Sequence, residues 1–301
     1  MADLPPQLAY FLQQVVNGLQ LGFVYALIAL GYTMVYGIVR LINFAHGDVF
    51  MVGSFVGFFA IAVLKLNFVL AILMAMLCCM VLGVTIERFA YRPLRRAPKI
   101  AALITAIGVS IFLEYFTSLK FVFGPNYRQF PRPFEVTTWT IGGVGISSIL
   151  VIIVVVSLIL VIGLQAFVTR TKTGIAMRAV SFDHDAARLM GINVDFVISV
   201  TFAIGSALAG AGGVLFAIAY PQIHPFMGIM PGLKAFVAAV LGGIGIIPGA
   251  FLGSLIMGQA EVMTTGYVSS TLRDAVAFGI LIIVLLVRPT GLLGKSGTEK
   301  V

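Results

Sequence analysis

The sequence predicts an all-α polytopic membrane protein, first of all because of its composition. Hydrophobic residues make up 60% of the 301 residues, whereas charged residues make up only 10%. An ordinary soluble domain is roughly 45–50% apolar and about 25% charged, so a soluble globule of this composition could not cover its surface with polar groups. The balance excludes a soluble enzyme, a disordered scaffold and a nucleic-acid-binding protein, despite the net charge of +8.

The second observation is the length of the apolar runs. A bilayer core about 30 Å thick needs about 20 apolar residues in a helix, and membrane β-strands would alternate over about ten residues instead. We therefore expect one transmembrane domain over 1–301 with about eight hydrophobic helical segments. The runs are 15–39, 42–64, 66–86, 100–123, 146–168, 197–219, 233–262 and 274–288. The stretch before the first run has no basic residue, unlike a cleaved secretory signal, so we expect that helix to be retained.

The basic residues predict the orientation. Twelve of the 19 Lys and Arg residues lie in 87–99, in 169–195, and in a tail with Arg288, Lys295 and Lys300. By the positive-inside rule, all three stretches and the C-terminus are expected in the cytoplasm. The excess positive charge then reflects topology and contact with the lipid bilayer.

The run 233–262 must return to the side from which it enters, because the basic tail follows the last run. Glycine costs about 1 kcal/mol and proline about 3 kcal/mol in a helix interior, so we expect a re-entrant or broken hairpin here. Irregular backbone at membrane depth is tolerated where it is buried in protein or lines a wet cavity. The interrupting residues, which are candidates for the translocation path, are Gly242, Gly243, Gly245, Pro248 and Gly249.

A similar interruption lies in the N-terminal half, where Asn43, His46 and Asp48 precede an apolar helix. A carboxylate at mid-membrane costs about 2.5–3.5 kcal/mol on insertion scales, so it normally faces a partner or water. One interpretation is that Asn43 and Asp48 cap a helix restarting at Val49, with His46 at the cytoplasmic headgroups. The other is a translocation gate near the cytoplasmic side.

Four further charged residues lie in or beside apolar runs. Glu114 lies in the middle of a crossing. Either it has a structural role and pairs with a hydroxyl group or with Lys120, or it lines a cavity. Glu261, Arg273 and Asp274 flank the outer end of the last hairpin, and we expect them to pair with one another at the rim.

The cytoplasmic loop 169–195 is long enough to carry structure of its own. Its apolar residues recur at helical spacing and its polar residues form the opposite face, which predicts a helix lying on the membrane or docking a cytoplasmic partner. The alternative is that Asp183 caps a second short helix. The apolar stripe is Ile175, Ala179, Phe182, Ala186 and Leu189; the polar face is Arg178, Ser181, Asp185 and Arg188.

The sequence contains no recognisable nucleotide-binding, catalytic or metal-binding motif. The nearest approach to a nucleotide-binding loop is PTGLLGKS at 289–296, where Pro289 replaces the first glycine. There is no HExxH, GxSxG or Cys/His ligand set, and the adjacent Cys78 and Cys79 give no metal or disulfide spacing. We therefore expect neither an enzyme nor a cofactor in this chain, and any ATP would be bound by another subunit.

Four stretches resemble the LivH-type permeases of bacterial branched-chain amino-acid ABC importers, and the resemblance runs from about Val15 to Leu293. They are NGLQLGFVYALIALGYTMVYGI (17–38), INFAHGDVFMVGSF (42–55), TGIAMRA with AARLMGINVD (173–195), and KAFVAAVLGGIGIIPGAFLGSLIMG (234–258). The resemblance implies the fold of a type II ABC importer permease. It also implies three kinds of partner: a second, LivM-like permease subunit, two cytoplasmic ATP-binding subunits, and a periplasmic substrate-binding protein that delivers Leu, Ile or Val.

The resemblance also carries residue roles. The segment Asp185–Gly191 is similar to the EAA-x-x-x-G signature of importer permeases, with aspartate in place of glutamate and without the later Ile-x-Leu-Pro part. Asn43, Ala45, His46 and Gly47 match the family's first-half motif, and the Gly/Pro residues of 242–249 match its second. The residues that match the ATPase-coupling loop are Gly174, Arg178, Ala179, Asp185, Ala186, Ala187 and Gly191.

The predicted function is thus the permease subunit of an importer in the bacterial inner membrane. An alternative within the class is a permease for urea or short amides. An alternative from another class is a proton-coupled secondary transporter that uses Asp48, Glu114 and Glu261. Such a transporter would drive uptake by itself under a pH gradient, whereas an importer permease would need its ATPases and binding protein.

Overall fold

A computed structural model describes residues 4–95 and 97–294; Lys295 and Lys300 of the predicted basic tail lie outside these ranges. Within them the chain is mostly helical. A π-helical turn (Glu87–Tyr91) and a 3₁₀ turn (Arg92–Leu94) follow α3. The helices are α1 (Pro6–Val39), α2 (His46–Ala62), α3 (Phe68–Ile86), α4 (Lys99–Ser118), α5 (Ser148–Arg170), α6 (Lys172–Phe182), α7 (His184–Leu189), α8 (Val194–Ala219), α9 (Ile229–Gly242), α10 (Ile247–Tyr267) and α11 (Arg273–Val287).

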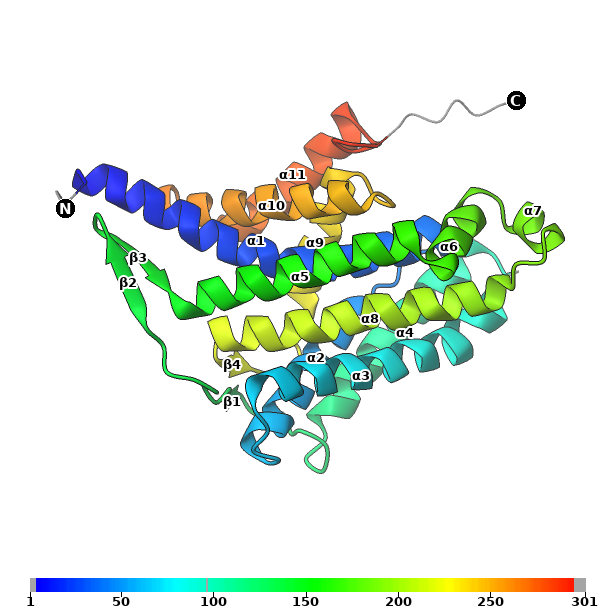
Figure 1. The fold of residues 1–301 in the computed structure, drawn as a ribbon, viewed down its shortest axis with the longest axis horizontal. Coiled ribbons are helices and arrows are strands. Elements are labelled where there is room, and N and C mark those ends of the chain that lie inside the picture. The colour runs from blue at the N-terminus through cyan, green and yellow to red at the C-terminus, as the bar shows by residue number, and fades with distance from the viewer. Residues whose placement is uncertain (1–3, 96, 295–301) are drawn as a thin grey trace.

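The long helices form a bundle around α1. Figure 1 shows α1, α5 and α8 running along the long axis, with α6 and α7 at one end and the N-terminus with β2 and β3 at the other. Helix α1 packs against α10, α8, α9 and α5, and it is buried continuously from Leu21 to Val35. A helix that is apolar on all sides is stable only when neighbours surround it.

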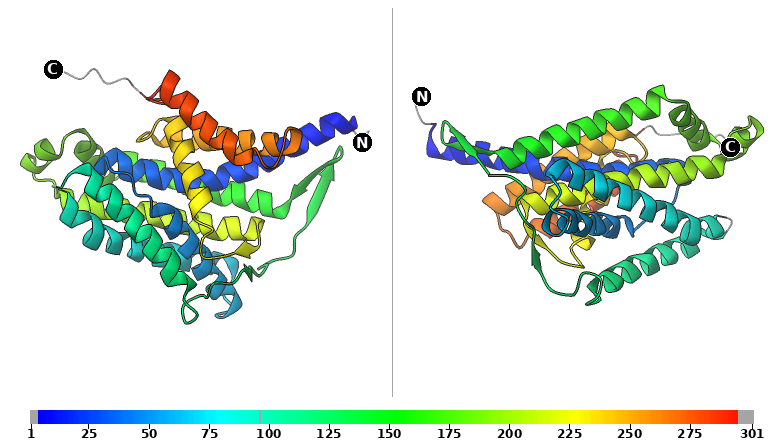
Figure 2. Two further views of the ribbon diagram at one scale, coloured as in Figure 1. Left: turned by 180° about the vertical axis from the view of Figure 1, so that it is seen from behind. Right: turned by 60° about the horizontal axis from the view of Figure 1, so that its bottom comes forward.

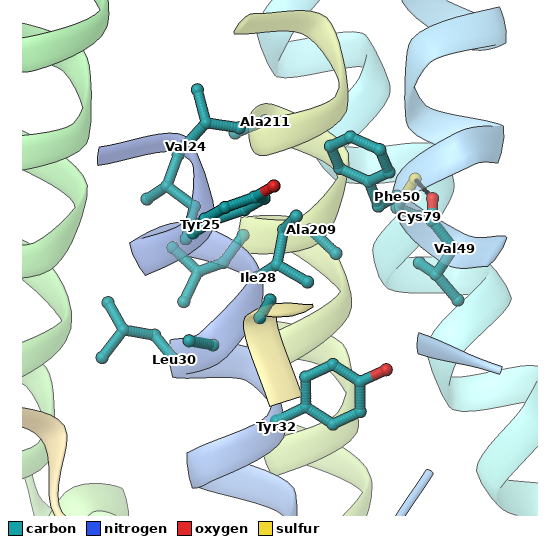
Figure 3. Packing of buried hydrophobic residues seen from close by; sticks show 14 of the residues in the cluster. Val24, Tyr25, Ile28, Leu30, Tyr32, Val49, Phe50, Cys79, Ala209 and Ala211 are labelled. Atoms are coloured by element: carbon teal, nitrogen blue, oxygen red, sulfur yellow. Dashed lines mark hydrogen bonds between the residues drawn. The ribbon is translucent and has the colours of Figure 1, made fainter. Parts of the chain in front are cut away.

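Side chains of α1 and α8 meet at the centre of the bundle. Figure 3 shows Val24, Tyr25 and Ile28 of α1 beside Ala209 of α8. On the far side of α8, Cys79 of α3 donates to the carbonyl of Val49 in α2 at 3.4 Å. Small residues on α8 let its neighbours approach closely, as is usual for helices that associate in lipid.

The predicted hydrophobic runs all carry helix, but their lengths differ. Among the described residues, five helices are long and apolar enough to span a membrane: Pro6–Val39, Phe68–Leu94, Ile100–Ser118, Ser148–Arg170 and Val194–Ala219. Helices α2 and α9 are shorter. Helix α1 begins nine residues before the predicted run because Pro6 suits the first turn of a helix.

The Gly/Pro-rich segment is broken. Helix α9 ends at Gly242, two glycines with positive φ follow (Gly243 at 107° and Gly245 at 95°), and α10 begins at Ile247. Pro248 lies in the first turn of α10, where no backbone hydrogen bond is lost. Lys234 on α9 lies 2.7 Å from Glu261 on α10, so the two helices stay in contact beyond the break, and α9 crosses α10 (Figure 1).

Two small antiparallel ribbons lie at the end of the bundle opposite α6 and α7. Strand β1 (Arg128–Gln129) pairs with β4 (Gln222–Ile223), and β2 (Thr138–Ile141) pairs with β3 (Val144–Ser147). Gly142 and Gly143, both with positive φ, form the turn between β2 and β3. Gln13 of α1 ties this hairpin down by a reciprocal pair of hydrogen bonds with the backbone of Gly145. The apolar-run analysis did not predict these strands.

Candidate functional site

The segment before α2 is buried, and the capping interpretation of its polar residues is wrong. Helix α2 begins at His46, and its N-cap, Ala45, makes no side-chain hydrogen bond. Asn43 instead accepts a hydrogen bond from the hydroxyl of Tyr91 at 2.9 Å, which ties the segment to the π-helical turn after α3. The side chains of Asn43, His46 and Asp48 are all almost completely inaccessible to solvent.

His46 does not lie at a headgroup surface. Its ring packs edge-on against Tyr32 of α1, with ring centroids 4.8 Å apart. It also fills the space beside Gly31, where a Cβ atom would overlap the imidazole. The imidazole therefore fills a gap between α1 and α2.

Asp48 points into a cavity of about 140 Å³ between α2, α4 and the start of α9. Ser110 of α4 donates a hydrogen bond to one oxygen of the Asp48 carboxylate. Glu114, one turn further along α4, lines the same cavity and is 7% exposed. Lys120 makes no ion pair within the described ranges, so the structure places Glu114 at a cavity wall.

A larger cavity of about 860 Å³ lies between α1, the 220–228 segment, α9 and α10. Its polar side chains include a group of ion pairs. Lys234 lies 2.7 Å from both Glu261 and Asp274, and Arg273 lies 3.3 Å from Glu261. Tyr25 donates a hydrogen bond to Glu261 at 2.8 Å. The expected pairing of Glu261, Arg273 and Asp274 is confirmed.

Lys234 and Tyr25 were not predicted at this site. Both are almost completely buried. A lysine inside the apolar stretch KAFVAAV was the available signal, because an ionisable residue within a membrane segment requires a partner. The partner could not be inferred because Glu261 lies 27 residues away, across the break between α9 and α10.

A second ion-pair group was also missed. Glu87 is fully buried in the π-helical turn and pairs with Arg95, which also pairs with Asp195 at the start of α8. Ser199 donates to Glu87 at 2.7 Å. The arrangement joins the predicted cytoplasmic segment after α3 to α8. Across the described ranges, no cluster of His, Cys, Asp and Glu is arranged to hold a metal ion.

Helix α9 separates the two cavities. The residues on its two sides alternate as the 3.6-residue period requires. The small cavity is lined by Gly228, Ile229, Gly232 and Leu233, and the large cavity by Met230, Pro231 and Lys234. In Figures 1 and 2, α9 runs across the direction of α1, α5 and α8.

The glycines of the broken segment lie at backbone contacts. A Cβ atom on Gly242 or on Gly249 would overlap the backbone of the other residue, and Gly245 lies against Gly37 of α1. Gly243 lies against the 290–294 segment. Of these candidates, only Pro248 lines a described cavity, an apolar one beside α5. The structure thus brings Asp48 and Glu114 together but holds the Gly/Pro residues elsewhere.

The 169–195 loop consists of two short helices, so the single apolar stripe is wrong. Asp183 ends α6 and caps α7, accepting from the N–H groups of Asp185 (2.8 Å) and Ala186 (3.0 Å). These N–H groups, that of Ala186 first, hold the pKa of Asp183 below its usual range. Helix α6 buries Gly174, Met177 and Val180.

Two residues of the predicted stripe, Phe182 and Leu189, are each 89% exposed. The coupling candidates themselves divide into three groups by solvent exposure. Arg178, Asp185, Ala186 and Gly191 are exposed, Ala179 is half-buried, and Gly174 and Ala187 are buried. Gly174 lies against the backbone of Phe167 and Val168, and Gly191 has a positive φ of 82°, so both glycines are needed by the fold of the loop.

Comparison with known proteins shows the family to which the chain belongs. Residues 14–285 match the family model described as the branched-chain amino acid transport system permease component. The chain belongs to this permease family. The high-affinity branched-chain amino acid transport system permease protein LivH of Escherichia coli K12 is 46% identical, and that of Salmonella typhimurium LT2 is 45% identical; each alignment covers 98% of this chain and 99% of the relative. The permease protein BraD of Pseudomonas aeruginosa is 44% identical over 98% of this chain and 100% of its own length.

The family match extends from α1 into α11. It therefore includes both cavities and the α6–α7 loop of this permease. The resemblance first seen in INFAHGD and LGGIGIIPGA is confirmed. The relatives are named as permease components of transport systems, which supports a transport protein rather than an enzyme.

Proposed function

We propose that this permease is the membrane-spanning subunit of a bacterial ABC importer for branched-chain amino acids. The observation that carries the proposal is the identity of about 45% over nearly the whole length of this chain and of relatives named for that transport. At that similarity an urea or amide permease is the weaker alternative. ATP hydrolysis is assigned to separate subunits, and this chain is expected to need no cofactor.

The proposed topology places the chain in the inner membrane with its C-terminus in the cytoplasm. The basic segments after α3 and around α6 and α7 support the cytoplasmic assignment. The eight runs then traverse or enter the membrane. We infer that the segment 233–262 enters from the outer side and returns to it; the contact between Lys234, near its start, and Glu261, near its end, supports this inference.

The α6–α7 loop is the proposed contact with the ATP-binding subunits. Phe182, Leu189 and Met190 form its apolar tip, and each is more than 80% exposed. Exposed apolar residues grouped on a polar loop mark a protein–protein contact. The loop is connected to the transmembrane bundle, since His184 hydrogen-bonds to the carbonyl of Ile38 at the end of α1 (2.8 Å).

The partners complete the mechanism. A periplasmic binding protein would deliver the amino acid to the outer cavity, and a second, LivM-like permease would form the other half of the path. Two ATPases would move the α6–α7 loops and, through them, α1. Because the permease needs only different stabilities of its outward- and inward-open states, it can bind its cargo weakly.

The test is reconstitution. The complete importer in proteoliposomes should accumulate radiolabelled leucine when ATP and binding protein are present, and this chain alone should not. Phe182→Glu or Leu189→Glu should lower ATP-dependent uptake at least about tenfold, because a hot-spot contact is typically worth 2 kcal/mol or more. The matched control is Phe89→Glu, which changes another exposed phenylalanine and should leave uptake unchanged.

The same assay tests the secondary-transporter alternative. Accumulation of leucine by this chain alone under a pH gradient would contradict the proposal. Normal uptake in both tip variants would leave the permease role intact but would rule out the α6–α7 tip as the ATPase contact.

A further inference from the structure

We propose that the cavity between α2, α4 and the N-terminus of α9 binds the zwitterionic head group of an α-amino acid. Asp48 and Glu114 would bind the ammonium group, and the first turn of α9 would bind the carboxylate. The inference rests on the proposed function and adds to it the atoms that meet the cargo.

The first observation is an unsatisfied acceptor. One oxygen of Asp48 accepts from Ser110; the other is buried, and among the described residues only the carboxyl of Glu114 lies within hydrogen-bond reach of Asp48 besides Ser110, so no cationic or amide side chain donates to the acidic pair. Asp48 is 1% exposed and lines the cavity. Buried polar atoms are almost always hydrogen-bonded, so an unpaired carboxylate oxygen that faces a cavity indicates a donor that enters it.

The charges around the cavity favour a cation. Glu114 lies beside Asp48 at the cavity wall, and no Lys, Arg or His is among the described residues that line it. A primary ammonium carries three N–H donors, which suits Asp48, Glu114 and the free lone pairs of Ser110. The α-ammonium of an amino acid therefore matches the donor that the cavity lacks.

The second observation is the start of α9. Gly228 and Ile229 lie at the cavity, and the helix has no side-chain cap and no acidic residue in its first turn. Among the described backbone hydrogen bonds, none is donated by the N–H groups of Gly228 and Ile229. Free N–H groups at a helix N-terminus bind carboxylates, and α9 has 14 residues, enough for its dipole to contribute.

The remaining wall is formed by aromatic and aliphatic side chains, Tyr32 among them. Phe44 and Leu233 line the cavity, and Gly47 and Gly232 bring the backbones of α2 and α9 into contact. A volume of about 140 Å³ admits a small head group but not a peptide. An aliphatic side chain would lie against the phenylalanine and leucine.

The experiment measures protection of a thiol in the cavity. In a Cys78→Ser background, which removes the exposed native thiol, Ser110→Cys is reacted with the small, uncharged reagent methyl methanethiosulfonate in the reconstituted importer without binding protein. Leucine should slow the labelling at least about tenfold, because it would occupy the cavity beside the new thiol. A site built for two polar groups rejects ligands that lack one. 4-Methylpentanoate, which lacks the ammonium, and 3-methylbutylamine, which lacks the carboxylate, should give little protection.

Two further variants test the assigned residues. Asp48→Asn and Glu114→Gln should each abolish protection by leucine and lower ATP-dependent uptake about tenfold. The labelling rate without leucine should stay near that of the parent, which shows that the cavity is still folded. The matched control is Glu135→Gln, an exposed carboxylate of the outer segment, which should change neither quantity.

The outcomes separate this site from the proposed function. If the parent importer takes up leucine but leucine gives no protection, or if both carboxylate variants transport normally, the site is wrong and the importer stands. Equal protection by 3-methylbutylamine or by sodium would show a plain cation site and would also overturn the assignment. If the parent importer takes up no branched-chain amino acid, the proposed function itself fails.

Discussion

At the residue scale, the most consequential side chain that the sequence analysis missed is Lys234. It is 2% exposed and lies between Glu261 and Asp274, while Tyr25 donates to Glu261 from α1. Removing one partner of a buried ion pair leaves an uncompensated charge, which is more costly than the pair is favourable. Arg273 and Asp274 are partly exposed, so their mutual pairing adds little.

Lys234→Met should therefore destabilise the protein by about 3 kcal/mol, near the lower end of the range for breaking a buried pair, since Arg273 and Tyr25 still contact Glu261. Thermal unfolding of the purified protein in detergent measures the change. Lys120→Met, at an exposed position, serves as the control. Adding Glu261→Gln to Lys234→Met should recover part of the loss; a double variant less stable than the single one would contradict this account.

The rule that polar residues are rare in membrane helices identified Asp48 and Glu114 but not their environment. Their spacing of 66 residues gives no indication that α2 and α4 meet. The same rule could not assign Asn43 and His46, because capping and tertiary contacts require the same residue types. Only the positions of Tyr91 and Tyr32 show that both side chains are held by aromatic neighbours.

At the element scale, glycine determines how closely the helices approach. A Cβ atom on Gly53 of α2 would overlap the backbone of Gly210 on α8, and backbone cannot rotate away as a side chain can. Gly163 of α5 has no neighbouring atom within 4 Å of its ideal Cβ position. Gly53, at a close helix contact, and Gly163, in open space, are therefore matched positions for comparing the same substitution.

Gly53→Ala should cost about 1–3 kcal/mol through overpacking, and Gly163→Ala should be neutral or stabilising by up to about 1 kcal/mol. Unfolding of both variants in the same detergent checks the difference. Equal stabilities would show that α2 and α8 separate without cost and would contradict the role given to Gly53.

The α6–α7 loop shows the limit of periodicity. Its apolar spacing continues across Asp183, where the chain leaves the helix to form a cap, so an uninterrupted pattern predicted one stripe. The alternative that the sequence offered to a single helix was a second short helix capped by Asp183. Which face lies against α5 could not be predicted, because that choice depends on the contact of Gly174 with the end of α5.

Asp183→Ala should increase amide hydrogen exchange in α7, because the N–H groups of Asp185 and Ala186 lose their acceptor. Asp183→Asn keeps an acceptor and is the control. The pKa of Asp183 is lowered in the fold, so its stabilising effect is complete above the ordinary value of about 3.9 and is lost as pH falls through the lowered value. Protection factors of α7 should not change across neutral pH; a loss between neutral and weakly acidic pH would contradict this.

At the scale of the whole molecule, composition and apolar runs were sufficient for the fold class. The long helices and the break at 243–246 follow from hydropathy, glycine and proline. The two ribbons did not, since their strands are two to four residues long and depend on pairing across up to 95 residues. The small and the large cavity were also beyond prediction because each is formed by three or more elements.

The proposed topology predicts which end of the helix bundle is accessible from outside the cell: the end with β2 and β3, and not the end with α6 and α7. In a Cys78→Ser background, Trp139→Cys in β2 should react with a membrane-impermeant maleimide in intact spheroplasts, and Leu189→Cys in α7 should react only after permeabilisation. Both positions are at least half exposed, so access should depend on the side of the membrane alone. Labelling of Leu189→Cys in intact spheroplasts, with Trp139→Cys labelled only after permeabilisation, would reverse the assignment; labelling of both from the outside would also contradict it.

One feature of the bundle bears on how the small cavity opens. Helix α4 lies at the edge of the bundle (Figure 2, right), packs mainly against α2 and the π-helical turn, and buries few side chains: Ala102, Ala106, Leu113, Glu114 and Thr117. It nevertheless carries Ser110 and Glu114. Displacing this one peripheral helix would hydrate the acidic pair while the α1–α8–α10 centre stays packed. Opening on that side would therefore break few van der Waals contacts.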